Sequence, residues 1–188
     1  MTTARDRLLD AAEDLFFSDG IAITGVDAVA ASAGVAIATL YAHFGSKDGL
    51  LAAVLERRLA AWTECWEAAV AAADSPADRL LAVFDAITDF RSTAGETQWC
   101  CFLATASERS RAGTMHDPVL TLVDRDTTEL HDRLVRLAEE ARLDDPAAIA
   151  GHLALVYNGV LASLLRGVPA DPVARGRRIA SAVVAAGA

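Results

Sequence analysis

The residues whose types and spacing point most directly to chemistry lie in the stretch 34–44. Before them, residues 26–33 carry apolar side chains at helical spacing, so one face of a short helix can pack on a neighbour. Gly34 suits the left-handed position that ends such a helix. In the second short helix, Leu40 and Phe44 are four residues apart and point to the core. This pattern predicts a helix-turn-helix, whose second helix can enter the major groove of DNA.

Other residue types give no pattern that supports catalysis or metal binding. The histidines are isolated, at positions 43, 116, 131 and 152, and the three cysteines, Cys65, Cys100 and Cys101, lack paired metal spacing. Cys100 and Cys101 could be read as a redox pair. However, adjacent cysteines close a strained ring poorly, and a buried helical cysteine usually acts as a small apolar residue. We therefore expect no enzyme, no metal and no cofactor.

Composition indicates an all-α protein. The hydrophobic content is 53%, alanine is very common, and no run alternates with the period of a strand. We expect about nine helices, and the longest apolar run, 153–165, is too short to span a bilayer and contains Asn158 and Gly159. Charged residues interrupt the N-terminal stretch, so a signal peptide is not expected. These features predict a soluble, cytoplasmic protein without a membrane segment.

Caps and breakers divide the chain into helices. Ser46, Ser75-Pro76, Asp145-Pro146 and Asp171-Pro172 can start helices, because short polar residues cap N-termini and proline is tolerated in the first turn. The expected helices cover residues 5–19, 26–33, 37–44, 47–73, 76–93, 99–106, 118–143, 146–166 and 172–186.

The helix expected over 146–166 is apolar on every side, so it must be buried on every side. One face can pack on the core of its own chain, and a second copy is the simplest cover for the other. Small residues such as Gly151 and Gly159 would let that copy approach closely. We therefore expect a homodimer through a four-helix bundle that residues 119–143 and 146–166 of each subunit form.

Charge limits how the chain could bind DNA. The formal net charge is −9, and residues 1–60 carry five cationic side chains against eight carboxylates. A DNA-binding surface must therefore be local, built from a few cations and neutral donors. Lys47 is the only lysine of the chain, and Arg5 and Arg7 form a short N-terminal arm. Weak non-specific binding should follow.

The N-terminal third resembles the tetracycline-repressor (TetR) family of bacterial transcription regulators. The match extends over many positions at the family's spacing, which makes it far more specific than a single short motif. The matching residues are Leu9, Ala11, Ala12, Phe16, Gly20, Thr24, Val26, Val29, Ala30, Ala33, Gly34, Val35, Thr39, Leu40, Tyr41, His43, Phe44, Ser46, Lys47, Leu50 and Leu51.

This resemblance implies a helix-turn-helix DNA-binding domain over residues 1–46 and a helical ligand-binding and dimerisation domain over 47–188. It also implies roles for individual residues in and next to the DNA-binding domain. Thr24 and Gly25 would approach phosphates, Ala36, Ile37, Ala38 and Thr39 would face bases, Tyr41 and His43 would contact the DNA backbone, and Lys47 would pair with a phosphate.

Two positions depart from the family's usual pattern. Gly25 stands where a capping serine or threonine is common, and Ala36-Ile37 stands where a hydroxyl and a polar or basic residue are common. No Arg, Lys, Asn or Gln lies within 36–44, so few bidentate contacts to bases are available. We expect specificity to depend on methyl contacts to thymine, on Arg5 and Arg7, and on DNA shape.

A ligand cavity in the C-terminal part could be lined by large apolar side chains with a few polar anchors. Plain core packing is the alternative for each of these residues. The candidates are Trp62, Trp66, Phe84, Trp99, Phe102, Met115, His152, Tyr157 and Asn158. A ligand held there would be small, flat and hydrophobic.

Together these features predict a dimeric repressor that occupies an inverted-repeat operator on double-stranded DNA and is released by a small hydrophobic inducer. Two alternatives remain open. One is an activator on the same fold, and the other is a helical ligand-binding dimer with weak or lost DNA binding, which the acidic head would favour.

Overall fold

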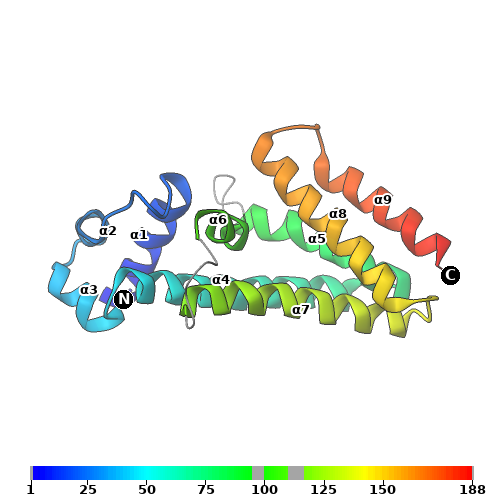
Figure 1. The fold of residues 1–188 in the computed structure, drawn as a ribbon, viewed down its shortest axis with the longest axis horizontal. Helices are drawn as coiled ribbons and strands as arrows, with labels where there is room; N and C mark the ends of the chain where they lie inside the picture. Colours follow the sequence, from blue (N-terminus) through cyan, green and yellow to red (C-terminus); the bar gives the residue numbers. More distant parts are fainter. Residues whose placement is uncertain (1, 95–99, 110–116, 188) are drawn as a thin grey trace. The chain divides into compact units, whose positions relative to one another are not determined.

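A computed structural model describes residues 2–94, 100–109 and 117–187, and these residues form helices joined by short connections (Figure 1). Every regular element within the described ranges is an α-helix, as the sequence predicted. The helices are α1 (Ala4–Ser18), α2 (Val26–Ala33), α3 (Ile37–Phe44), α4 (Lys47–Ala72), α5 (Pro76–Ala94), α6 (Cys101–Glu108), α7 (Pro118–Glu140), α8 (Pro146–Arg166) and α9 (Pro172–Ala186).

Several helix ends differ from the sequence-based expectation, and one expected cap is absent. α7 ends at Glu140 instead of Leu143, because Arg142 adopts a left-handed φ of 56° and the Leu143 N–H bonds back to the Ala138 carbonyl. Cys100 lies before α6 and caps it, since its Sγ accepts from the Leu103 N–H at 3.5 Å. Asp171 precedes α9 but makes no side-chain cap.

Packing divides the chain into two compact units. Unit 1 comprises residues 1–60 and 100–126, and unit 2 comprises residues 61–99 and 127–188. Unit 1 thus contains the helix-turn-helix together with the first part of α4, α6 and the start of α7. The boundary between a DNA-binding domain and a ligand-binding domain, predicted between residues 46 and 47, concerns function and stays a prediction.

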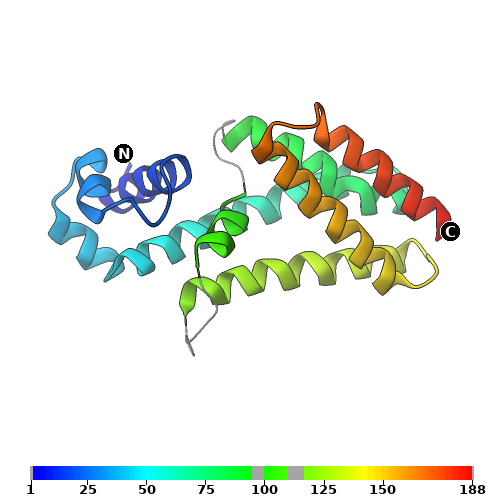
Figure 2. The same cartoon turned by 45° about the horizontal axis from the view of Figure 1, so that its top comes forward.

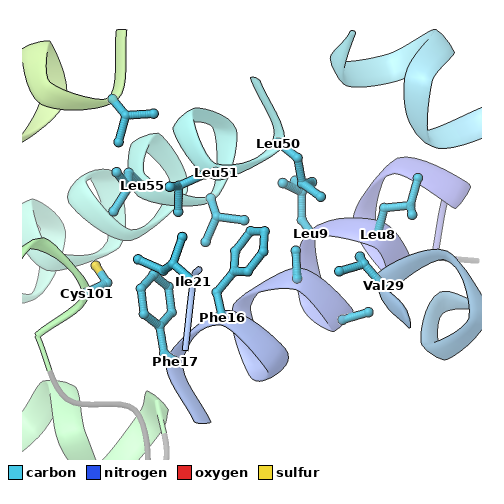
Figure 3. Close-up of a cluster of buried hydrophobic side chains, with 14 of the residues drawn as sticks. Leu8, Leu9, Phe16, Phe17, Ile21, Val29, Leu50, Leu51, Leu55 and Cys101 are labelled. Atoms are coloured by element: carbon cyan, nitrogen blue, oxygen red, sulfur yellow. The ribbon is translucent and has the colours of Figure 1, made fainter. Parts of the chain in front are cut away.

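The core of unit 1 is a continuous apolar cluster (Figure 3). Phe16 of α1 and Leu50 and Leu51 of α4 are almost fully buried in it, and Cys101 of α6 lies at its edge. α1 begins with a capping box, in which Thr3 and Asp6 each bond the other's backbone or side chain. The cluster therefore attaches α4 and α6 to the helix-turn-helix by hydrophobic burial.

A buried ion-pair network also joins α1 to α4. Glu13 is only 8% exposed, and its carboxylate accepts from Arg57 at 2.5 Å and from Arg58 at 2.9 Å. Arg57 also pairs with the exposed Asp10 at 2.6 Å. Because Arg58 is buried as well, the two charges at this point compensate each other away from water.

Unit 2 is built around the packing of α9 on α5 and α8, which lie side by side in both views (Figure 1 and Figure 2). Gly176 of α9 makes the close approach possible, because a Cβ there would lie 2.2 Å from Val160 and 3.4 Å from Phe84. Phe84 and Leu153 are fully buried. Ser75 caps α5 and Asp145 caps α8 through side-chain bonds, as predicted.

One face of α8 stays outside the core of the single chain. Leu155 is 72% exposed and Leu165 is 51% exposed, although Ile149, Leu153 and Val160 are buried. By length and hydropathy α8 could cross a membrane, and so could α2 and α3 as one bent pair, but core helices of soluble proteins pass the same test. α8 was expected to be buried on every side, but a single chain leaves one of its faces exposed.

We expect Glu13→Gln to lower the free energy of unfolding by about 3 kcal/mol, because it removes the buried carboxylate charge that pairs with the buried Arg58 and with Arg57. Urea denaturation followed by circular dichroism measures the change. Glu56→Gln, on the exposed side of α4, is the control and should change stability by no more than about 0.5 kcal/mol. Equal stabilities of the two variants would contradict a stabilising role for the network.

Candidate functional site

α2 and α3 have the geometry of a helix-turn-helix. The chain bends by 107° between them, within the range of roughly 90–120° that is typical of the motif. Gly34 has a left-handed φ of 64°, and its N–H bonds to the Ala31 carbonyl at 3.1 Å. The Val35 N–H closes the turn on the Ala30 carbonyl at 3.0 Å. A residue with a Cβ would be strained at position 34, so the glycine determines this turn.

α3 buries little of its own surface. Leu40 is fully buried and is the anchor of the helix, whereas Phe44 is half-buried. Ile37 is 45% exposed and Tyr41 is 48% exposed. The candidate contact residues Ala36, Ala38 and His43 are exposed as well, and Thr39 is half-buried.

The N-terminus of α3 has no side-chain cap, because Ala36 holds the cap position. Backbone N–H groups of the first turn of such a helix can therefore bind an outside acceptor such as a phosphate oxygen. Gly25 likewise caps α2 without a side-chain bond. Gly25 and Ala36, which depart from the family's usual residues, thus leave the N-termini of α2 and α3 without a side-chain cap.

Three other candidate residues surround this helix pair in different ways. Arg5 is exposed and its guanidinium lies 5.5 Å from the ring centre of Phe44, which places the N-terminal arm beside the end of α3. Thr24 is buried, and its hydroxyl donates to the carbonyls of Gly20 at 2.7 Å and Leu15 at 3.1 Å. The Lys47 ammonium donates to the Ala22 carbonyl at 3.2 Å.

Several arginines of unit 1 are held in internal ion pairs. Arg57 and Arg58 pair with carboxylates of α1, as described above, and Arg109 pairs with Asp48 and with Asp117. Arg109 binds Asp117 at 2.6 Å. These cations are neutralised within the protein, whereas among the described residues near α3 Arg5 and Arg7 are exposed and Lys47 is half-buried, so these three could face a phosphate.

The end of α6 is tied to the helix-turn-helix by two adjacent residues. The Glu108 carboxylate accepts from the Ala22 N–H at 2.8 Å and from the Ile21 N–H at 3.3 Å, both in the loop between α1 and α2. Arg109 binds Asp48 in the first turn of α4. A shift of α6 would therefore act on both the loop and α4. Sequence reasoning did not single out either residue.

The structure separates the residues that the sequence proposed for ligand binding. Trp62, Trp66 and Tyr157 come together in unit 2, with Trp62 6.0 Å from the ring centres of both others. Phe84 is buried between α5 and α9, and Phe102 is buried in the core of unit 1. His152 and Asn158 are exposed on α8. Trp99 and Met115 lie outside the described residues.

Two residues near the tryptophans were absent from the sequence-based set. Phe90 packs edge-on against Trp62 at 5.6 Å, and the Arg133 guanidinium lies 4.3 Å above the Trp66 ring. Arg133 directly precedes the fully buried Leu134, but neighbouring positions of a helix face different directions, so the sequence gives no sign that its side chain packs inward. The sequence analysis did not single out Arg133.

Comparison with known proteins identifies the head and the fold. Residues 8–54 match the family profile of bacterial regulatory proteins of the tetR family. A TetR-family regulator from Streptomyces coelicolor is 28% identical with a TM-score of 0.85, over 98% of this chain and 95% of that chain. A TetR regulator from Streptomyces avermitilis is 30% identical with a TM-score of 0.71, over 95% and 98% of the two chains. The chain belongs to the TetR family.

Curated relatives match a shorter part of this TetR-family chain. Helix-turn-helix transcriptional regulators from two strains of Mycobacterium tuberculosis are each 38% identical over 78 residues. That match covers 42% of this chain and 39% of each relative. As a TetR-family member, the protein is a transcriptional regulator with a helix-turn-helix and not an enzyme.

The cysteine pair of this TetR-family member sits in a poor environment for redox chemistry. Burial raises the pKa of the Cys100 thiol to about 11, above its ordinary 9.0, and burial also raises the pKa of the Cys101 thiol. Cys101 packs in the core of unit 1. Since only the thiolate is reactive, both groups are held in the inert form at neutral pH.

We expect the native cysteine pair to react with a disulfide reagent about 100-fold more slowly at pH 8 than the unfolded chain does, because a pKa of about 11 leaves far less thiolate. A Cys65→Ser background confines the measurement to Cys100 and Cys101. Absorbance of the released thiol, with and without guanidinium chloride, gives both rates. Equal rates would contradict the inert assignment.

Proposed function

We propose that this protein is a homodimeric repressor that binds an inverted-repeat operator in double-stranded DNA and is released by a small molecule. The exposed face of α3 carries the proposal: only Leu40 of this helix is fully buried, and the helix bends away from α2 by 107°. A helix held in this way can place its first turn in the major groove. Such a regulator would act in the cytoplasm and would need no cofactor.

In this proposal, Ala36, Ile37, Ala38 and Thr39 face the bases. Their short or apolar side chains favour contact with thymine methyl groups over bidentate hydrogen bonds. Tyr41 and His43 contact the DNA backbone from the exposed side of the helix. Specificity then depends substantially on DNA shape, since few polar groups are available to read base edges.

Phosphate contacts come from the uncapped start of α3, from Arg5 and from Lys47. The Thr24 hydroxyl is already bonded to two carbonyls, so residues 24 and 25 would meet a phosphate through their backbone. Lys47 can reach a phosphate only by leaving the Ala22 carbonyl or by sharing its three protons between both acceptors. The limited number of free cations predicts weak binding to non-specific DNA.

Dimerisation is proposed through α8, as the sequence suggested, but with α9 in place of α7. The exposed residues of α8 recur at helical spacing, with Leu155, Asn158, Gly159 and Leu165 on one face. Ile179 of α9 is 56% exposed, whereas none of the large exposed apolar side chains in the described chain lies on α7. A second copy that covers this face would bury apolar surface in a two-fold interface.

Release would require a ligand that binds one conformation better than the other. α4 contributes residues to both units, so a ligand held in unit 2 can act on the head through this helix. In unit 1 the contacts of Glu108 with the α1–α2 loop and of Arg109 with Asp48 provide a second attachment. Movement of these elements would change the separation of the two α3 helices and their match to successive major grooves.

A ligand-binding dimer that has lost DNA binding is the second candidate. Two observations support it. Residues 1–60 are acidic, and Arg57, Arg58 and Arg109 of unit 1 are held in internal ion pairs. An activator on the same fold differs from a repressor only in where the operator lies relative to the promoter. Binding and footprinting on the DNA upstream of the protein's own gene separate these possibilities.

We expect the protein to bind this upstream fragment at low salt with protection of two half-sites. Lys47→Ala should weaken binding to specific and non-specific DNA alike and lower the slope of log K against log salt by about 1. Fluorescence anisotropy over a series of potassium chloride concentrations measures both quantities. Arg136→Ala, which removes an exposed cation of α7, is the matched control.

An unchanged salt slope in Lys47→Ala would refute a phosphate contact by this residue. Absence of binding to any fragment at low salt would leave the ligand-binding dimer as the function.

Leu155→Glu should convert the dimer into a monomer, because a carboxylate would be buried without a partner at the interface. We expect the dissociation constant of the dimer to rise roughly 100-fold or more, a change that light scattering after size-exclusion chromatography detects. Ile23→Glu, at a residue of unit 1 that is 78% exposed, should leave the dimer intact. A dimeric Leu155→Glu protein would move the interface away from α8.

A further inference from the structure

Four aromatic side chains of unit 2 form one group, which we call the aromatic group: Trp62, Trp66, Phe90 and Tyr157. Trp62 is central, with ring centres of the other three at 5.6 to 6.0 Å. Trp66 is buried, at 3% exposed, whereas Trp62, Phe90 and Tyr157 are only half-buried. The aromatic group therefore has a buried end at Trp66 and a partly accessible end.

The buried end carries two hydrogen-bond donors without acceptors. The indole Nε1 of Trp66 and the Nε of Arg133 are buried, and neither has a hydrogen-bond partner among the residues that the structure describes. The Arg133 guanidinium lies 4.3 Å above the Trp66 ring, so the two donors belong to one place. Buried indole and guanidinium groups ordinarily find an acceptor.

The charge of the half-buried Arg133 is also only partly compensated within the protein. Burial lowers the pKa of Arg133, which means that its surroundings disfavour the cation. Glu67 attracts Arg133 at a distance, but no ion pair of Arg133 occurs within the described ranges of the chain, and Glu67 itself is exposed. Plain core packing does not explain a half-buried arginine, stacked on a tryptophan, whose buried Nε is unsatisfied together with the tryptophan N–H.

We propose that Trp66 and Arg133 bind the anionic group of a small planar ligand, with the rest of the ligand stacked on the aromatic group. This inference rests on the proposed ligand-responsive function and names the ligand's chemical class, a flat aromatic carboxylate. A carboxylate has two oxygens, which can accept from both donors at once and compensate the guanidinium charge. A water molecule could also accept from both donors, but it carries no negative charge to offset the guanidinium.

The accessible side of the aromatic group fits a planar body. Trp62 and Tyr157 present ring surface that is half-buried, and aromatic rings prefer offset or tilted stacking at the distances found within this group. Uncharged flat molecules would gain the stacking but not the ionic contact. Discrimination between a carboxylate and its neutral amide is therefore the distinctive property of this site.

The test is isothermal titration calorimetry of the full-length protein without DNA, with 2-naphthoate as the carboxylate and 2-naphthamide as its neutral counterpart. We expect 2-naphthoate to bind more tightly than the amide. Arg133→Met should weaken 2-naphthoate binding roughly 10- to 100-fold and leave 2-naphthamide binding nearly unchanged, because it removes a charge-assisted contact and keeps the stem. Trp66→Phe keeps an aromatic ring, removes the N–H and should weaken 2-naphthoate roughly tenfold.

Arg136→Met is the matched control, since Arg136 is an exposed arginine of the same helix that pairs with Glu140, and it should bind 2-naphthoate as the wild type does. Thermal unfolding of each variant verifies that it is folded. Equal affinities for the acid and the amide, wild-type affinity in Arg133→Met, or no heat of binding with millimolar 2-naphthoate would each overturn the proposal.

The same titrations distinguish this site from the proposed function. If 2-naphthoate binds through Arg133 but does not weaken binding to the operator fragment, the site stands and release of DNA by a ligand fails. If 2-naphthoate both binds and weakens operator binding, and Arg133→Met abolishes that effect, the site and the ligand response are supported together.

Discussion

A helix that reads DNA must leave most of its surface uncovered, and α3 meets this constraint with one fully buried side chain, Leu40. With so little burial, the orientation of α3 depends on the turn before it. Gly34 and the hydrogen bonds that close its turn set the 107° bend, and the core formed by α1 and α4 receives Leu40. Burial of Leu40 in the hydrophobic cluster of unit 1 therefore holds this exposed helix in place.

Arg57, Arg58 and Arg109 form ion pairs inside the protein, whereas the arginine that we propose for DNA contact is Arg5. Glu13 compensates Arg57 and Arg58 where α1 meets α4, and Asp48 compensates Arg109 near the start of α4. These pairs hold helices together but remove cations from the surface that would face phosphates. We therefore expect the DNA-binding domain to attract DNA only weakly at long range and to obtain its specificity from contacts at short range.

In our proposal, two residues of unit 2 that lie 67 positions apart in the sequence select the chemistry of the ligand. Trp66 comes from α4 and Arg133 from α7, and each provides a buried donor that nothing in the described chain satisfies. Polar groups left unsatisfied in a native interior are expensive, so their retention is an argument for a bound partner. A protein selected for stability alone would place apolar side chains there.

The sequence by itself determined the helices, the turn at Gly34 and the family, because caps, periodicity and turn residues act over a few positions. It also indicated that Trp62, Trp66 and Tyr157 could share a site. Only the tertiary structure decided that Phe102 belongs to a different unit and that Arg133 stacks on Trp66. Such contacts join residues far apart in the chain, and a single arginine in a helix carries no local signal of what it will meet after folding.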